Sequence, residues 1–277
     1  MYLSEINIYP IKSLAGISLQ TATVERRGLE FDRRWMLIDE NNKFLTQREF
    51  PKMARVKTEI LADGLRVSSD GHGLPIAFEP ETGATQSVKI WQSRCKAKIY
   101  EDLVNEWFSD VLQMKCRLAV MPAETERRVN YFYAVRKDDH VSFADGYPVL
   151  LTGENSLADL NARLAEALPM NRFRPNLVVA EADSFAEDSW KKIRVGEAIF
   201  HVVKPCARCV MTTIDQTRGE KDGKEPLKTL AAFRIPKRSI KKKILFGQNL
   251  IAEKAGDLLR VGDPVEVLET KRGPKFL

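Results

Sequence analysis

The sequence predicts an α+β fold that is rich in β-structure, with a few helices at the periphery of barrel-like sheets. Two observations lead to this prediction. Over the first hundred residues, and again after residue 175, short apolar segments alternate with turn residues. Between these regions, and once more near residue 230, apolar residues recur at helical spacing. Closely spaced strands are typical of barrels and sandwiches, and helices with one apolar face cover such sheets.

Six strands are predicted in the first hundred residues. Each is a run of β-branched, aromatic or alternating apolar residues that ends where Gly, Pro, Asn or Asp gather. The predicted strands are 5–9, 17–25, 33–40, 56–61, 64–69 and 88–100, and the predicted turns are 40–43, 62–64, 69–73 and 79–83. Pro10 ends the first strand, because proline has no backbone donor for the ladder.

Three helices are predicted from apolar residues that recur every three or four positions. The first helix spans 101–113, the second spans 154–169 and ends at Pro169, and the third spans 225–234 with Pro226 in its first turn. The predicted apolar face of the first helix is formed by Leu103, Trp107 and Val111, with Val104 and Phe108 alongside.

The second half of the chain returns to a β pattern. Its predicted strands are 176–181, 198–203, 210–215, 248–253 and 263–269. We expect a boundary near residues 115–125, so that a barrel-like domain at 1–118 packs against a second barrel domain at 119–277.

Composition indicates a globular cytoplasmic protein of 277 residues, 44% hydrophobic and 30% charged. No apolar run approaches the ~20 residues that a membrane helix needs. The N-terminus carries Glu5 and no apolar core of signal-peptide length, so we expect mature sequence. Four scattered cysteines do not suggest a disulfide framework, which favours a reducing cytoplasm.

The net charge is +6, and part of the excess lies in two basic segments, 236–243 and 270–277. Such runs usually form solvated surfaces, although they can also dock an acidic partner or attract an anionic substrate. Nucleic acid is not an expected partner, because aromatic residues do not interleave with the basic runs.

A CxxC formed by Cys206 and Cys209 is the most informative local motif, and it is compatible with four uses. A structural zinc site would need two distant histidines as further ligands. A thioredoxin-like dithiol opens a helix, but the β-branched stretch 210–215 predicts a strand. The pair could also be two buried structural cysteines. The fourth use is a soft metal held by one thiolate, which the flanking cations Lys204 and Arg208 favour.

Motifs from about residue 2 to 268 resemble MOSC proteins (molybdenum-cofactor sulfurase C-terminal-like). KPCARCVMTTID, GKEPLKTLAAFR, LFGQNLIAE and VGDPVEVL are similar to the C-terminal half of a MOSC domain. IYPIKSLAG, GLEFDRRWMLID and FLTQRE resemble the β-barrel region that precedes MOSC in the family of the mitochondrial amidoxime-reducing component and its bacterial relatives. SLADLNARL, NRFRPNLVV and AEDSW follow in the family's order.

The resemblance implies an enzyme that binds the molybdenum cofactor, with the metal held by the pterin dithiolene and one cysteine. By position in the motif that cysteine is Cys209, which would also be the catalytic residue, with Cys206 beside it. The other matching cofactor contacts are Lys12, Ser13, Arg33, Arg174, Asn176 and Arg208. The sequence departs from the family's pterin loop at Gly146 and Tyr147, where relatives carry Ser or Thr, so side-chain contacts are not expected there.

The implied activity is two-electron reduction of small N-hydroxylated compounds, such as amidoximes, hydroxylamines and N-hydroxylated bases. This would be a detoxifying reaction that needs no pyridoxal phosphate. The electrons would come from a separate donor, a ferredoxin or a flavoprotein reductase, because no cysteines show plant-type cluster spacing. The basic residues at 237–243 would dock such a donor. The alternative is a non-catalytic carrier of molybdenum cofactor or persulfide sulfur. A monomer is expected in either case.

Overall fold

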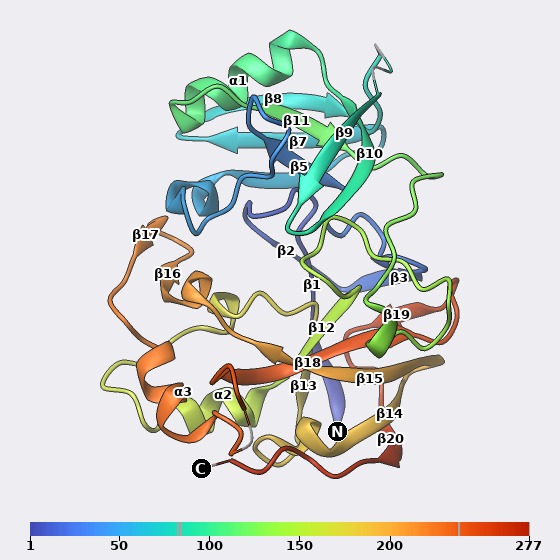
Figure 1. The fold of residues 1–277 in the computed structure, drawn as a ribbon, viewed down its shortest axis with the longest axis vertical. Coiled ribbons are helices and arrows are strands. Elements are labelled where there is room, and N and C mark those ends of the chain that lie inside the picture. Colours follow the sequence, from blue (N-terminus) through green and yellow to red (C-terminus); the bar gives the residue numbers. More distant parts are fainter. Residues whose placement is uncertain (82, 84, 238, 277) are drawn as a thin grey trace.

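An eight-stranded sheet dominates the lower part of the molecule in Figure 1 and unites the N-terminus with the second half of the chain. The computed structural model describes residues 1–81, 83, 85–237 and 239–276. The strand order of this sheet is β2-β1-β13-β12-β18-β15-β14-β20. The strands are β1 Tyr2–Ile8, β2 Ile17–Leu19, β12 Val149–Gly153, β13 Leu177–Ala180, β14 Trp190–Val195, β15 Ala198–Ala207, β18 Leu245–Ala252 and β20 Val265–Thr270.

The upper part contains two smaller sheets, one of four strands (β5-β11-β10-β9) and one of three (β6-β7-β8), with helix α1 against them (Figure 1). These elements are β5 Trp35–Ile38, β6 Lys57–Ile60, β7 Gly64–Ser69, β8 His72–Ala77, β9 Thr85–Ile90, β10 Ser93–Ile99, α1 Asp102–Leu112 and β11 Arg117–Val120. The remaining short strands are β3 Thr21–Glu25, β4 Gly28–Leu29 and β19 Leu258–Arg260 in one sheet, and β16 Ile214–Asp215 with β17 Glu220–Lys221 in another.

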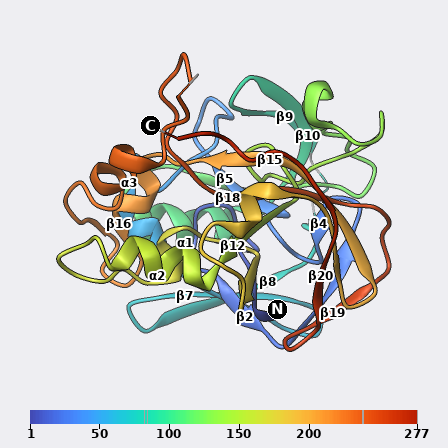
Figure 2. The ribbon, with the colours of Figure 1, turned by 90° about the horizontal axis from the view of Figure 1, so that it is seen from below.

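Helix α2 (Glu154–Asn161) packs against the inner strands β12 and β13 of the large sheet, and helix α3 (Leu227–Phe233) lies beside α2 (Figures 1 and 2). In the described part of the chain, no helix is long and apolar enough to cross a membrane. Strands outnumber helices and the helices are peripheral, so the predicted β-rich α+β class is confirmed.

The sheets do not follow the order of the chain. β1 pairs with β13 along Tyr2–Ile6, and β19 pairs with β3, so segments from both ends share sheets. The fully buried side chains of Leu3, Phe200 and Leu250 belong to one apolar core that spans this arrangement. The domain boundary between residues 118 and 119 stays a prediction. Strands β1 and β2 precede this boundary in the sequence, but they belong to the large sheet, whose other strands follow it.

The buried face of helix α1 is rotated from the centre of the predicted one. Val104 and Phe108 are buried as predicted, together with Leu112, and Trp107 and Val111 are partly buried. Leu103, which was expected in the apolar face, is 68% exposed. Asn105 explains the rotation, because its amide donates to the Tyr100 carbonyl (2.7 Å) and accepts from the Leu118 amide (2.9 Å). A buried amide needs such partners, so Asn105 must face the sheet.

Two predicted elements differ from the observed ones because side chains form hydrogen bonds with the nearby backbone. Helix α2 stops at Asn161 instead of Pro169, since the Asn161 amide bonds both the backbone NH and the carbonyl of Leu168 at 3.0 Å. The predicted strand 210–215 is a 3-10 helix over Val210–Thr213, in which the Thr212 and Thr213 hydroxyls donate to carbonyls three residues back. Such local bonds compete with strand pairing.

Two further strands were mispredicted. The stretch 88–100 is a hairpin of β9 and β10 that turns at Trp91, whose φ is +52°. Trp91 carries no turn signal, and the predicted single strand was therefore wrong. Strand β8 begins at His72, inside the predicted turn 69–73, and tolerates Pro75 because it is an edge strand. Three predicted segments include one residue outside the described ranges: Thr82, Arg238 and Leu277.

The rotation of α1 predicts unequal costs of truncation. Phe108→Ala removes a fully buried ring and should lower the free energy of unfolding by about 3–5 kcal/mol. Leu103→Ala on the exposed face should change it by about 0.5 kcal/mol or less. Urea unfolding followed by circular dichroism measures both free energies. Equal losses would show that Leu103 is packed as closely as Phe108, which would contradict the rotated face.

Candidate active site

A pocket of about 220 Å³ collects residues from both halves of the chain. Its lining includes all of the cofactor contacts expected from the sequence: Lys12, Ser13, Arg33, Arg174, Asn176, Arg208 and Cys209. Among the described residues that line it, six carry a cationic side chain and one, Asp145, is acidic. The structure therefore brings together residues as far apart in the sequence as Lys12 and Asn249.

The backbone at three of these residues is left-handed. Ser13, Arg33 and Arg174 have φ values of +67°, +51° and +52°. This region costs a non-glycine residue roughly 1–2 kcal/mol. Such conformations gather at functional sites, where the surrounding structure holds them in place.

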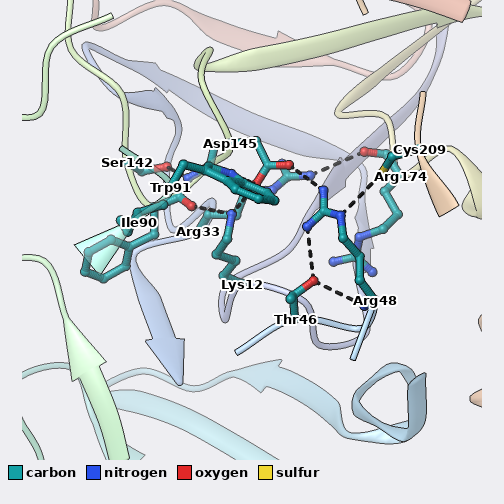
Figure 3. Close-up of polar contacts among 12 residues, drawn as sticks. Lys12, Arg33, Thr46, Arg48, Ile90, Trp91, Ser142, Asp145, Arg174 and Cys209 are labelled. Carbon is teal, nitrogen blue, oxygen red and sulfur yellow. Dashed lines mark hydrogen bonds and ion pairs between the residues drawn. The ribbon is translucent and has the colours of Figure 1, made fainter. Parts of the chain in front are cut away.

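Cys209 contacts a residue that the sequence reasoning did not single out, Arg48 (Figure 3). Cys209 lies where β15 has ended and the 3-10 helix Val210–Thr213 begins. The Arg48 Nε donates to the Cys209 Sγ at 3.3 Å, and its guanidinium also donates to the Thr46 hydroxyl at 3.1 Å. Arg48 belongs to the FLTQRE motif, and this motif was the feature of the sequence that could have pointed to Arg48 as a site residue.

Asp145 bridges Arg48 and Lys12 (Figure 3). The Lys12 Nζ lies 2.5 Å from Asp145 Oδ1, and the Arg48 Nη2 lies 3.0 Å from Oδ2. The Trp91 indole donates to the same carboxylate at 3.2 Å and lies under the Arg48 guanidinium. Asp145 was also missed, since its role arises only where loops from distant parts of the chain meet.

The bridge sets the charge states of its members. Burial lowers the pKa of Lys12 to about 8, while Asp145 acts in the opposite direction. Desolvation by the pocket walls would raise the pKa of Asp145, but the charges of Lys12 and Arg48 outweigh it and hold that pKa below its ordinary value. Asp145 therefore stays ionised at neutral pH and offsets part of the positive charge.

Arg33 and Arg174 hold the ring of Tyr9 between their guanidinium groups, at 4.4 and 4.1 Å from the ring centroid. The Arg33 Nη1 also donates to both oxygens of the Asp32 carboxylate, at 2.7 and 2.9 Å. Although burial opposes it, Asp32 raises the pKa of Arg33. Burial lowers the pKa of Arg174 to about 10, which still leaves it cationic at neutral pH.

Asn176 and Arg208 line the pocket, but their side chains form hydrogen bonds mainly with backbone groups of the protein. The Asn176 amide donates to the Asn7 carbonyl at 3.0 Å and accepts from the Leu150 amide and Arg33 at 3.1 Å. Arg208 donates to the carbonyls of Phe246 and Phe173 at 2.7 and 2.8 Å. Both residues therefore position loops of the pocket.

Unpartnered donors remain beside the pocket. Arg208 Nη2 and Arg172 Nη1 are buried and have no hydrogen-bond partner among the residues that the structure describes, although Arg172 Nη2 pairs with Asp215 and Asp222. A buried cationic donor without an acceptor is unfavourable, so these atoms favour an anionic ligand. Guanidinium groups for a phosphate and a cysteine sulfur for a soft metal together fit the molybdenum cofactor.

The two cysteines of the motif differ in surroundings. Cys209 faces the Arg48 guanidinium, whereas burial outweighs Arg208 and raises the pKa of Cys206. The Lys204 ammonium packs over the Tyr133 ring at 4.1 Å. All four cysteines are free thiols. Among the residues with described positions, no group of three or more His, Cys, Asp or Glu side chains could hold a metal.

The Lys12–Asp145 pair predicts a shifted lysine titration. Lys12 should lose its proton near pH 8, and Asp145→Asn should lower this pKa further, because the carboxylate favours the ammonium form. The ¹³Cε chemical shift followed with pH reports the titration, and Lys12→Met identifies the signal. A lysine that titrates near 10.5 in both proteins would contradict the pairing.

The internal bonds of Asn176 predict a stability cost. Asn176→Ala leaves the Asn7 carbonyl and the Leu150 amide without this partner and should lower the free energy of unfolding by about 2–4 kcal/mol. The exposed neighbour Asn171 serves as control, and Asn171→Ala should cost about 0.5 kcal/mol or less. An Asn176→Ala protein of unchanged stability that loses cofactor would instead indicate a direct cofactor contact.

Comparison with known proteins agrees with this geometry. The model of the MOSC N-terminal beta barrel domain matches residues 1–115, and that of the MOSC domain matches residues 138–266. Mitochondrial amidoxime-reducing component 1 of Mus musculus and component 2 of Rattus norvegicus are each 33% identical, over 96% and 95% of this chain and 82% of their own lengths. Molybdenum cofactor sulfurase of Oryza sativa subsp. japonica is 31% identical over 96% of this chain and 35% of its own length. The chain therefore belongs to the MOSC-domain family that includes the mitochondrial amidoxime-reducing components.

Proposed function

We propose that the protein is a molybdenum-cofactor-dependent oxidoreductase that reduces small N-hydroxylated compounds in the cytoplasm. The observation that carries the proposal is the Cys209 thiol at the wall of a pocket with six cationic side chains, in a chain related to amidoxime-reducing components. For an amidoxime the reaction takes up two electrons and two protons, breaks the N–O bond, and yields an amidine and water. The cofactor would supply this two-electron chemistry when bound.

The residues of the pocket have separable roles in this proposal. Cys209 would be the protein ligand of the metal, and Arg48 orients its sulfur through the Nε hydrogen bond. Lys12, Arg33, Arg172 and Arg174 would bind the anionic part of the cofactor, with Ser13 at the same wall. Asp145 is ionised at neutral pH, so it positions Lys12 and Arg48 and is not a proton donor.

The charge of the pocket also suits the proposed substrate class. An amidoxime is neutral at physiological pH, whereas its amidine product is a stronger base and becomes cationic. Six cationic side chains against one carboxylate disfavour the cationic product more than the neutral substrate. The cations that the cofactor's anion does not neutralise, together with Arg48 and Arg208, would therefore promote release of the product.

A carrier of molybdenum cofactor or persulfide sulfur is the second candidate. It is favoured by the alignment with molybdenum cofactor sulfurase over 96% of this chain and by the second thiol, Cys206, in the pocket. The deciding experiment expresses the protein in a host that makes the cofactor, measures molybdenum and pterin content, and assays an amidoxime with reduced methyl viologen. Bound molybdenum without turnover, together with release of cofactor to an acceptor protein, would favour the carrier.

The roles of the two cysteines predict unequal effects of substitution. Cys209→Ser should reduce amidoxime turnover below detection and change the absorption spectrum of the bound cofactor, since oxygen replaces a soft sulfur ligand. Cys206→Ser should retain the spectrum and lower turnover by about tenfold or less. Equal loss of activity and equal spectral change in both variants would indicate a site that uses both thiols.

A further inference from the structure

Two exposed segments, about one hundred residues apart in the sequence, lie near the pocket. One is the aromatic loop around the 3-10 helix Tyr131–Tyr133, in which Tyr131 is 77% and Phe132 is 88% exposed. The other is the basic segment 239–243, in which Ile240 is fully exposed and is followed by three exposed lysines. Both project from the same side of the molecule, at the upper edge of Figure 2.

Lys204 links the aromatic loop to the pocket. Its ammonium lies 4.1 Å from the ring centroid of Tyr133 and 5.5 Å from that of Tyr147, and Tyr147 lines the pocket. The basic segment connects to the pocket through the backbone, because Ile244, the residue after Lys243, accepts a hydrogen bond at 2.8 Å from the backbone NH of Arg208, which lines the pocket. The aromatic loop and the basic segment therefore each adjoin a residue of the pocket lining, Tyr147 for the loop and Arg208 for the segment.

The positive charge of this region is not offset locally. The described residues of the basic segment include no acid, and none of Lys241, Lys242 and Lys243 forms an ion pair with a described acidic residue. The acids of the aromatic loop are engaged elsewhere, because Asp138 pairs with Arg26 and Asp139 accepts from the backbone amides of Val135 and Arg136. The region thus presents apolar side chains and lysines together.

We propose that Tyr131, Phe132, Ile240, Lys241, Lys242 and Lys243 form a docking face for an acidic one-electron carrier protein, which rests on the proposed reductase function. Exposed aromatic side chains act as anchors in protein interfaces, and lysines at a rim steer an acidic partner. The position beside Tyr147 brings the carrier's redox group to the mouth of the pocket that holds Cys209.

The stoichiometry of the reaction suits such a face. Two reduced carriers, one amidoxime and two protons give two oxidised carriers, one amidine and one water. A one-electron carrier must therefore dock and leave twice in each turnover. An open face with screened charges permits rapid exchange, and transient redox complexes use small interfaces.

The test compares two electron sources in the cofactor-loaded enzyme. A triple variant, Lys241→Glu, Lys242→Glu and Lys243→Glu, should lower kcat/KM for a reduced plant-type ferredoxin at least about tenfold, and Phe132→Ala should lower it severalfold. Turnover with reduced methyl viologen should remain within about twofold in both variants, because a small donor needs no dock. Raising NaCl from about 20 to about 300 mM should weaken only the ferredoxin reaction.

The control reverses the same number of charges elsewhere. Lys57→Glu, Arg66→Glu and Lys115→Glu change exposed residues of the upper part of the molecule and should leave the ferredoxin reaction within about twofold. An equal loss in this control, or no turnover with either ferredoxin or flavodoxin while methyl viologen supports turnover, would overturn the docking face and leave the proposed function intact. No turnover with methyl viologen would overturn both.

Discussion

The carboxylate of Asp145, shared between Lys12 and Arg48, is the interaction on which the pocket depends. Lys12 follows β1, Arg48 follows β5, and Asp145 precedes β12, so one side chain joins three segments of the chain. Without the Asp145 carboxylate, the positive charges of Lys12 and Arg48 would repel each other and push apart the loops that carry them. The shared anion offsets that repulsion, and through Arg48 it also determines where the Cys209 sulfur lies.

Elsewhere in the pocket, arginine side chains are likewise paired with carboxylates or packed against an aromatic ring. Arg33 is paired with Asp32, Arg172 with Asp215 and Asp222, and Tyr9 separates Arg33 from Arg174. Each arginine is thus held before any ligand arrives, which limits the conformational entropy that binding must overcome. Unpartnered nitrogens on Arg172 and Arg208 leave capacity for further acceptors. The pocket is preorganised for an anion without being neutralised.

Much of the fold could be predicted from the sequence, because most strands and helices have a clear period and clear ends. Three of the failures share one cause: side chains whose partners are local or distant backbone groups, which no period reveals. Asn105 rotated α1, Asn161 shortened α2, and Thr212 and Thr213 turned a predicted strand into a 3-10 helix. In the pocket, motif order predicted Cys209, Lys12, Arg33, Arg174 and Arg208, but it did not predict Arg172. Arg48 and Asp145 were missed because their meeting depends on tertiary structure, and the internal bonds of Asn176 are equally invisible in a sequence.

The pairing of β1 with β13 has a consequence for how the molecule is made. During synthesis, β1 emerges from the ribosome about 170 residues before β13, and until then only the edge of β1 that pairs with β2 has its native neighbour. Contacts between such distant residues slow folding. The walls of the pocket draw on residues from Lys12 to Asn249, so they can close only after β18, which carries Asn249, has been released. The site therefore cannot be complete until most of the chain has been synthesised.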